Sequence, residues 1–329
     1  MSLTASHPIQ ASSVTSALDI IGDRWTLLIL RDAFLGIRRF EQWQHHLGIA
    51  RRLLADRLKK LVANGLFVRA PYQAHRLRYD YHLTPMGHDL YALALMIRRW
   101  ERRWGTGVDA VVGEITLVHR PCGSKAEPRC VCVHCGQEVT AQQTSFEARP
   151  EASREPHVWL RRQRRSSMTS SQAPNRSPFL QDAIDILGDR WTYLVLIAVF
   201  CGTRRFTAFR QALGVATNIL SDRLRRLVEA QILAHIPSTE QSNAYEYALT
   251  EKGLDLFPVI VALLQWGDRW LPGPHRPALI LRHQLCGRRL KSSVTCDVCG
   301  DSLRSPDVEY RLPSCHSRST TSSTRSRQA

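Results

Sequence analysis

Two stretches of the chain, 17–104 and 183–270, repeat the same order of apolar and polar positions without a gap. The clearest element is "RRLLADRLKKLVANG", in which Leu54, Leu58 and Leu61 fall on one face of a helix and charged residues lie opposite. This pattern predicts an amphipathic helix with one face in a protein core. Its presence in both stretches indicates a tandem duplication.

The elements around this helix predict a helix-turn-helix followed by a wing. Gly22 is expected to end one helix and Asp23 to cap the next, and a short helix over 39–47 then leads through the turn "GIA". Two extended runs after the amphipathic helix bracket the tip "QAHRLR" and are expected to form a hairpin. The sequence therefore predicts a mainly α fold with small β wings, in the α+β class.

A longer helix after each wing carries an apolar seam, with Thr84 and Thr250 as the expected N-caps. The seam residues are Leu90, Leu93, Ile97, Trp100 and Trp104, and in the second copy Leu256, Val259, Leu263, Trp266 and Trp270. Packing within its own domain is the simpler explanation, but a two-position stripe is narrower than an ordinary core-facing stripe. We therefore expect these helices to pair, either between subunits or between the two copies.

The repeat also divides the chain into segments. We expect winged helix-turn-helix domains at 12–104 and 178–270, zinc-ribbon-like extensions at 114–137 and 278–303, a basic disordered linker at 138–177 and a disordered tail at 304–329.

The charge of the chain favours a polyanionic partner. Its 45 Lys and Arg against 29 Asp and Glu give +16, which suits nucleic acid. The first residues lack the apolar core of a signal peptide, and the longest apolar runs are too short to cross a bilayer. We expect a cytoplasmic protein without membrane contact. In that reducing compartment, nine cysteines point to metal binding rather than to disulfides.

Each copy ends in two cysteine-bearing turns at the same spacing. The expected ligand sets are His119, Cys122, Cys132 and Cys135 in the first copy, and His283, Cys286, Cys296 and Cys299 in the second. Each set predicts a Cys3His ribbon holding one structural zinc ion, about two per chain. A redox dithiol and unligated relics of the duplication are the alternatives.

The combined residues resemble the HxlR-type winged-helix transcriptional regulators of bacteria. The resemblance rests on "GDRWTLLILRDAFLGIRRFEQWQHHLGIARRLLADRLKKLVANGL", on "YDYHLTPMG" and on the Trp-ended helix, and it covers both copies. It implies binding of double-stranded DNA by a dimer, with the second helix of each helix-turn-helix in the major groove. Two copies in one chain would then form an intramolecular pseudo-dimer. The cysteine that many members carry before the first helix is missing here, and the sequence names no effector.

The DNA-reading residues are expected on the second helix and the wing of each copy. They are Arg39, Arg51, Arg52, Arg57, Lys59, Arg76, Arg78, Arg205, Thr217, Asn218, Arg223 and Arg225. The first copy has the more basic wing and is expected to bind DNA more tightly. Asp56 and Asp222 are expected to pair with Arg or Lys side chains three or four residues away, such as Arg52 with Asp56.

Two other classes of function compete with this interpretation. A protein-interaction scaffold is the first, because the second wing, "STEQSNA", lacks basic residues. A zinc-dependent enzyme is the second, but the His-x-Glu of zinc deaminases is missing, and four protein ligands leave no open position for water. The sequence therefore predicts a regulator without catalytic activity.

Overall fold

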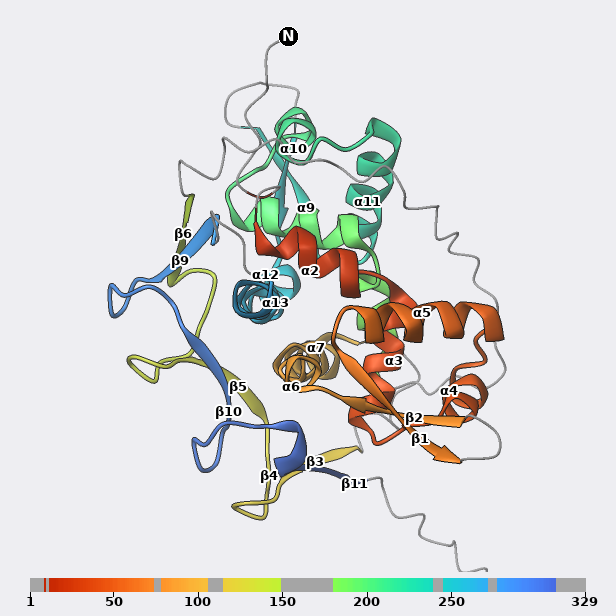
Figure 1. The fold of residues 1–329 in the computed structure, drawn as a ribbon. Helices are drawn as coiled ribbons and strands as arrows, with labels where there is room; N and C mark the ends of the chain where they lie inside the picture. Colours follow the sequence, from red (N-terminus) through yellow and green to blue (C-terminus); the bar gives the residue numbers. More distant parts are fainter. Residues whose placement is uncertain are drawn as a thin grey trace, which may run out of the picture.

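The computed structural model describes residue 9 and residues 12–73, 78–105, 115–148, 180–238, 245–271 and 277–311. The first copy comprises α2 (Ser13–Ile21), α3 (Arg24–Phe34), α4 (Phe40–Leu47), α5 (Arg51–Ala63), β1 (Phe67–Gln73), β2 (Arg78–Leu83), α6 (Pro85–His88) and α7 (Tyr91–Trp104), followed by β3 (Thr116–His119), β4 (Ser124–Lys125), β5 (Pro128–Cys132) and β6 (Thr144–Ala148). The second comprises α8 (Gln181–Leu187), α9 (Arg190–Phe200), α10 (Phe206–Leu213), α11 (Thr217–Glu229), β7 (Leu233–Pro237), β8 (Tyr245–Leu249), α12 (Glu251–Leu254) and α13 (Phe257–Trp270), followed by β9 (Leu279–His283), β10 (Ser292–Cys296), η2 (Ser305–Asp307) and β11 (Val308–Arg311). Figure 1 shows α7 and α13 near its centre and the strands after them from the left side of the view to its bottom.

The predicted helix caps are present. The Asp23 carboxylate accepts a hydrogen bond from the Thr26 backbone N–H at 3.2 Å and so satisfies one of the free donors at the start of α3. Thr84 caps in the same way, accepting from the Gly87 N–H at 3.2 Å, but this cap belongs to the single turn α6. The seam helix α7 begins only at Tyr91, so the predicted long helix is two pieces.

Each copy forms a helix-turn-helix with a wing. Gly48 ends α4 in the left-handed conformation, at φ 59°, which lets the chain turn tightly into α5. The Leu54, Leu58 and Leu61 side chains of α5 are buried, as their spacing predicts. Strands β1 and β2 then pair antiparallel, with Phe67 opposite Leu83, and form the wing.

The two seam helices pack against each other within the chain. Their tryptophans make reciprocal hydrogen bonds: Trp100 Nε1 donates to the Lys252 carbonyl and Trp266 Nε1 to the Met86 carbonyl, both at 2.9 Å. Trp104 Nε1 likewise donates to the Asp255 carboxylate at 2.7 Å, and Trp270 Nε1 donates to the Asp89 carboxylate at 2.8 Å. The seam therefore buries its apolar face against the sibling copy, and the two halves are related by a pseudo-two-fold axis.

The first helix of each copy packs on the last helix of the other. Helix α2 lies against α13 and α8 lies against α7. The Glu101 carboxylate of α7 accepts from the backbone N–H groups of Asp182 and Ala183, at 3.3 and 2.8 Å, and so caps α8. On the other side Ser13 donates to Asp268 at 2.5 Å. This exchange of helices ties each half to its sibling by side-chain contacts as well as by the seam.

The strands after α7 and α13 also pair across the halves. Strand β5 pairs with β10, β6 with β9, and β3 with β11, all antiparallel. These pairings correct the expected arrangement of two separate ribbons, because the strands form ladders between the copies. Strand β6 lies inside the predicted linker, 138–177, and β11 inside the predicted tail, 304–329, so both extensions reach further along the chain than expected.

The cores of the two halves differ at one polar cluster. In the first half the buried Asp32 carboxylate accepts from Arg31 Nε at 2.9 Å and lies 2.8 Å from His46 Nδ1. The corresponding positions in the second half are all apolar: Ile197, Ala198 and Ala212.

Among the described residues, no helix combines the length and apolar character that a bilayer crossing requires.

Candidate nucleic-acid interface and metal centres

Helix α5 presents an open basic face. Its thirteen residues include five cations and one anion. Arg51, Arg52 and Lys59 are exposed. The Arg51 guanidinium lies 5.0 Å from the centre of the Phe40 ring, and within the described residues the side chains of Arg52 and Lys59 make no ion pair or hydrogen bond. The expected Arg52–Asp56 pair is likewise not among the ion pairs of the described residues, so this prediction is wrong.

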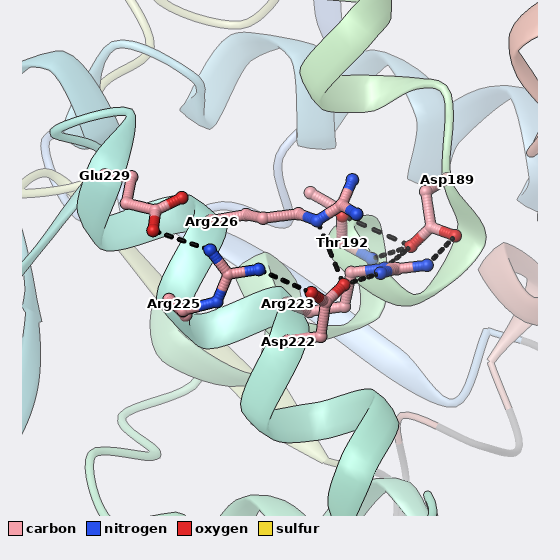
Figure 2. Close-up of polar contacts among 7 residues, drawn as sticks. All are labelled: Asp189, Thr192, Asp222, Arg223, Arg225, Arg226 and Glu229. Atoms are coloured by element: carbon pink, nitrogen blue, oxygen red, sulfur yellow. Dashed lines mark hydrogen bonds and ion pairs between the residues drawn. The ribbon is translucent and has the colours of Figure 1, made fainter. Parts of the chain in front are cut away.

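Helix α11 has a different charge pattern, with three cations and two anions. Figure 2 shows Asp222 at the centre of a network, where it accepts from Arg225 at 2.8 Å and pairs with Arg226 at 2.9 Å and with Arg223. Glu229 holds the other side of Arg225 at 2.6 Å. Burial opposes ionisation of Asp222, but hydrogen bonding from Arg225 and the charges of Arg226 and Arg223 outweigh it and lower the pKa of its carboxyl group.

Two of the arginines predicted to bind DNA contact aspartates that cap helices. Arg57 Nε donates to Asp23 at 2.9 Å, and Arg223 Nε donates to Asp189 at 2.6 Å. Asp23 and Asp189 are equivalent residues that also face each other in an antiparallel bridge. These arginines connect α5 and α11 to the bridge at which the two equivalent aspartates meet.

The remaining predicted residues that the structure describes lie in the helix-turn-helix segments and the wings. Arg39 pairs with Asp80 of the wing at 3.1 Å, and Arg205 pairs with Glu246 at 3.0 Å, so both connect the helix-turn-helix to the wing behind it. Arg78 is exposed at the start of β2, and Arg76 lies outside the described residues. Thr217 and Asn218 are exposed at the N-terminus of α11.

The eight predicted metal ligands form two clusters, but the grouping differs from the expected one. One cluster contains His119, Cys122, Cys296 and Cys299, and the other contains Cys132, Cys135, His283 and Cys286. Each cluster thus takes two residues from each half, and the expectation of one ligand set per copy is wrong. The physical reason is the antiparallel β5–β10 ladder, which places Cys132, at the end of β5, beside the start of β10, and Cys296 beside the start of β5.

The spacing of the ligand atoms suits a tetrahedral metal ion. In the first cluster, His119 Nδ1 lies 3.4 Å from Cys122 Sγ and 3.3 Å from Cys299 Sγ, and Cys122 Sγ lies 4.0 Å from Cys296 Sγ. Zinc bonds of about 2.3 Å to sulfur and about 2.0 Å to nitrogen imply tetrahedral edges of about 3.8 and 3.5 Å. Both clusters could therefore hold a metal ion.

The second cluster has matching dimensions. Its sulfur-to-sulfur distance, from Cys132 to Cys286, is 3.9 Å, and His283 Nδ1 lies 3.4 Å from Cys135 Sγ and 3.6 Å from Cys286 Sγ. With four protein ligands in each cluster, the arrangement suits a structural site and leaves no position for a reacting water.

The turns of Cys122 and Cys286 favour thiolates, the form that binds metal, whereas burial and the neighbouring cysteines raise the pKa of the Cys132 and Cys299 thiols. A hydrogen bond from the backbone N–H of Ser124 lowers the pKa of the Cys122 thiol to about 6. At the equivalent turn, the backbone N–H of Arg288 lowers the pKa of Cys286. Gly123 and Gly287, at φ 68° and 66°, provide the left-handed backbone that points these N–H groups at the sulfurs.

Among the described residues, the cysteines outside the clusters are Cys130 and Cys201. Cys130 is buried opposite Val294, its equivalent residue, so the pseudo-two-fold axis passes between them. Burial raises the pKa of the Cys130 thiol to about 11 and that of Cys201 to about 12, which keeps both thiols protonated and unreactive.

The sequence did not reveal the crossed grouping, because spacing along the chain is the same whichever half completes a cluster. A signal was present in the offset between the copies: it is 166 up to the seam helices but 164 from His119 to His283. That shift marks the extensions as a unit separate from the winged helices, without identifying their pairing.

Comparison with known proteins identifies the repeat. The model of the HxlR-like helix-turn-helix family matches residues 20–109 and again 186–274. A relative described as an uncharacterized HTH-type transcriptional regulator of Mycobacterium tuberculosis (strain ATCC 25618 / H37Rv) is 43% identical over 145 residues, which cover 44% of this chain and 90% of the relative.

Further similarities each cover less than half of this chain. The uncharacterized HTH-type transcriptional regulator YvaP of Bacillus subtilis (strain 168) is 30% identical over 95 residues, or 29% of this chain and 88% of the relative. The crystal structure of PA1607 covers 43% of this chain and 94% of its own, at 33% identity and a TM-score of 0.36. The curated relatives are named as regulators and not as enzymes. With both copies matched over more than half its length, the chain belongs to the HxlR-like helix-turn-helix family and carries the family's domain twice.

Proposed function

We propose that this protein is a sequence-specific transcriptional regulator that reads a two-part DNA operator as a single-chain pseudo-dimer. The main support for this proposal is the arrangement of α5 and α11, the second helix of each helix-turn-helix, which we call the reading helices. Both are exposed, and the pseudo-two-fold axis at the seam relates them. Such symmetry matches two half-sites on duplex DNA. Because the halves belong to one chain, each is free to prefer a different half-site.

The first half is proposed as the tighter DNA-binding half. The uncompensated charges of Arg52 and Lys59 are available to phosphates, which supply most of the affinity of such complexes. Arg51 and Arg52, at the start of α5, suit guanine, and Asn218, at the start of α11, suits adenine. Arg57 and Arg223 would orient the helices through their aspartate partners.

We further propose that both clusters hold zinc, giving about two structural ions per chain. Three thiolates and one imidazole at edges of 3.3 to 4.0 Å form a donor set that zinc prefers. The ions would brace the extensions, and the winged-helix domains would keep the boundaries predicted from the sequence.

A second candidate function is an interaction scaffold in which only the first half binds DNA. The carboxylates that hold Arg223, Arg225 and Arg226 favour it, because cations already paired within α11 attract phosphate weakly. In that case the second half would recruit a protein partner.

Footprinting the full chain on the DNA upstream of its own gene tests both candidates. The regulator proposal expects protection of two different half-sites, about 10 bp or a small multiple of that apart. Protection of one half-site only would favour the scaffold. No preference over random duplex DNA would overturn the proposal of sequence-specific binding.

A further inference from the structure

We infer that the two metal ions act as staples between the halves, because each ion's coordination sphere is completed only when the two copies are paired. This inference rests on the proposed metal binding and does not depend on DNA binding. It assigns the ligands of each ion and connects metal content to the pairing of the winged-helix domains.

The clusters divide their ligands evenly. The turn with His119 and Cys122 comes from the first half and faces Cys296 and Cys299 of the second. The other cluster has the reverse composition, with His283 and Cys286 facing the turn of Cys132 and Cys135. Either half alone would offer an ion only two ligands at each site, which is half of a tetrahedral shell.

Backbone hydrogen bonds hold the facing turns together. Within the ladders between the halves, the Val133 N–H donates to the Lys291 carbonyl, and the Gln284 N–H donates to the Gln143 carbonyl, both at 2.8 Å. The Arg120 N–H donates to the Asp307 carbonyl at the same distance. These bonds lie next to the ligand turns, so the crossed grouping follows from strand pairing and not from side-chain placement alone.

The stapled strands also contact the seam helices. Arg99 of α7 pairs with Glu138, beyond the Cys135 turn, at 2.6 Å. On the other side, Gln265 of α13 accepts from the Ser292 backbone N–H at 3.2 Å. The ions therefore brace the same helix pair that carries the winged helices, and metal loss is expected to loosen the spacing between α5 and α11.

Pairs of cysteine substitutions in the full chain distinguish crossed from separate ligand sets. Cys122→Ser with Cys296→Ser damages one crossed cluster and spares the other, so one of the two zinc ions should survive dialysis against a competing chelator. Cys122→Ser with Cys132→Ser damages both clusters, so both ions should be lost. Separate sets would give the opposite result, with one ion kept by the second variant and none by the first, and that result would overturn the inference.

A measurement on the unsubstituted chain tests the same grouping without depending on whether the variants fold. Protein loaded with ¹¹³Cd and isotope-labelled cysteine should show two cadmium signals, one coupled to the β-protons of Cys122, Cys296 and Cys299 and the other to those of Cys132, Cys135 and Cys286. Coupling of one cadmium signal to Cys122 and Cys132 together would refute crossed ligation. A wild-type chain that takes up no metal would overturn the inference together with the proposed zinc sites.

Discussion

The unequal charge of the two reading helices leads to a quantitative prediction. Lys59 of α5 and Arg225 of α11 are equivalent positions, but only Arg225 is held by carboxylates, at 2.8 Å from Asp222 and 2.6 Å from Glu229. The Lys59 ammonium has no such partner among the described residues. Substituting each by Ala therefore removes a free cation in one half and a compensated cation in the other.

The expected magnitudes follow from counterion release. Each phosphate contact contributes about 0.9 to the slope of log K against log salt, so Lys59→Ala should flatten the slope by about 0.9. Between 50 and 200 mM salt, that one contact changes affinity by about 3.5-fold. Arg225→Ala should change the slope much less, because a phosphate must first compete with two exposed ion pairs of about 0.2–1 kcal/mol each.

The converse substitution, Glu229→Ala, removes one of the two carboxylates that hold the Arg225 guanidinium. Glu229 corresponds to Ala63 in the first half, so Glu229→Ala gives α11 the residue that α5 already has. This variant should steepen the salt dependence by up to about 0.9. Glu147→Ala is the matched control, since it removes the same charge from a partner of Arg282 in the extension.

Fluorescence anisotropy with duplex DNA over a salt series measures these slopes, and thermal unfolding checks that the variants remain folded. Equal flattening by Lys59→Ala and Arg225→Ala would refute the argument that intrahelical carboxylates neutralise α11. An unchanged slope for Glu229→Ala, or a slope change in the Glu147→Ala control as large as that in Glu229→Ala, would refute it as well.

Three further predictions concern the wing, the core and assembly. Arg76→Ala with Arg78→Ala should weaken DNA binding and flatten its salt dependence, which the same titration measures, because both remove wing charge. Asp32→Ala should destabilise the chain by about 3–5 kcal/mol in urea unfolding, since it takes the carboxylate from a buried charge cluster, whereas replacing Arg31, Asp32 and His46 together by the second half's Ile, Ala and Ala should cost far less. Light scattering at micromolar protein should give the mass of one chain, because the seam is already filled within it, and an obligate dimer would show that the seams pair between chains.

The sequence by itself determined the local structure of each copy. Asp23 and Thr84 cap helices because a short side chain with an oxygen acceptor satisfies free backbone N–H groups wherever it precedes a helix. Leu54, Leu58 and Leu61 are buried because helical spacing places them on one face. The eight residues of the two clusters were likewise identifiable, because residue type and local turn spacing decide which side chains could bind a metal ion.

Only the tertiary structure decided which partner each seam helix packs against and which copy supplies the other two residues of each Cys/His cluster. The seam of Trp100 could have paired with another chain, and Cys122 could have shared an ion with Cys132, because both alternatives have the same spacing along the sequence. The antiparallel β5–β10 ladder and the exchange of α2 and α8 resolve these choices through contacts between residues more than 80 positions apart. The tertiary structure also decides which charges are already paired: Arg57 lies against Asp23 because α3 packs beside α5 within the first half.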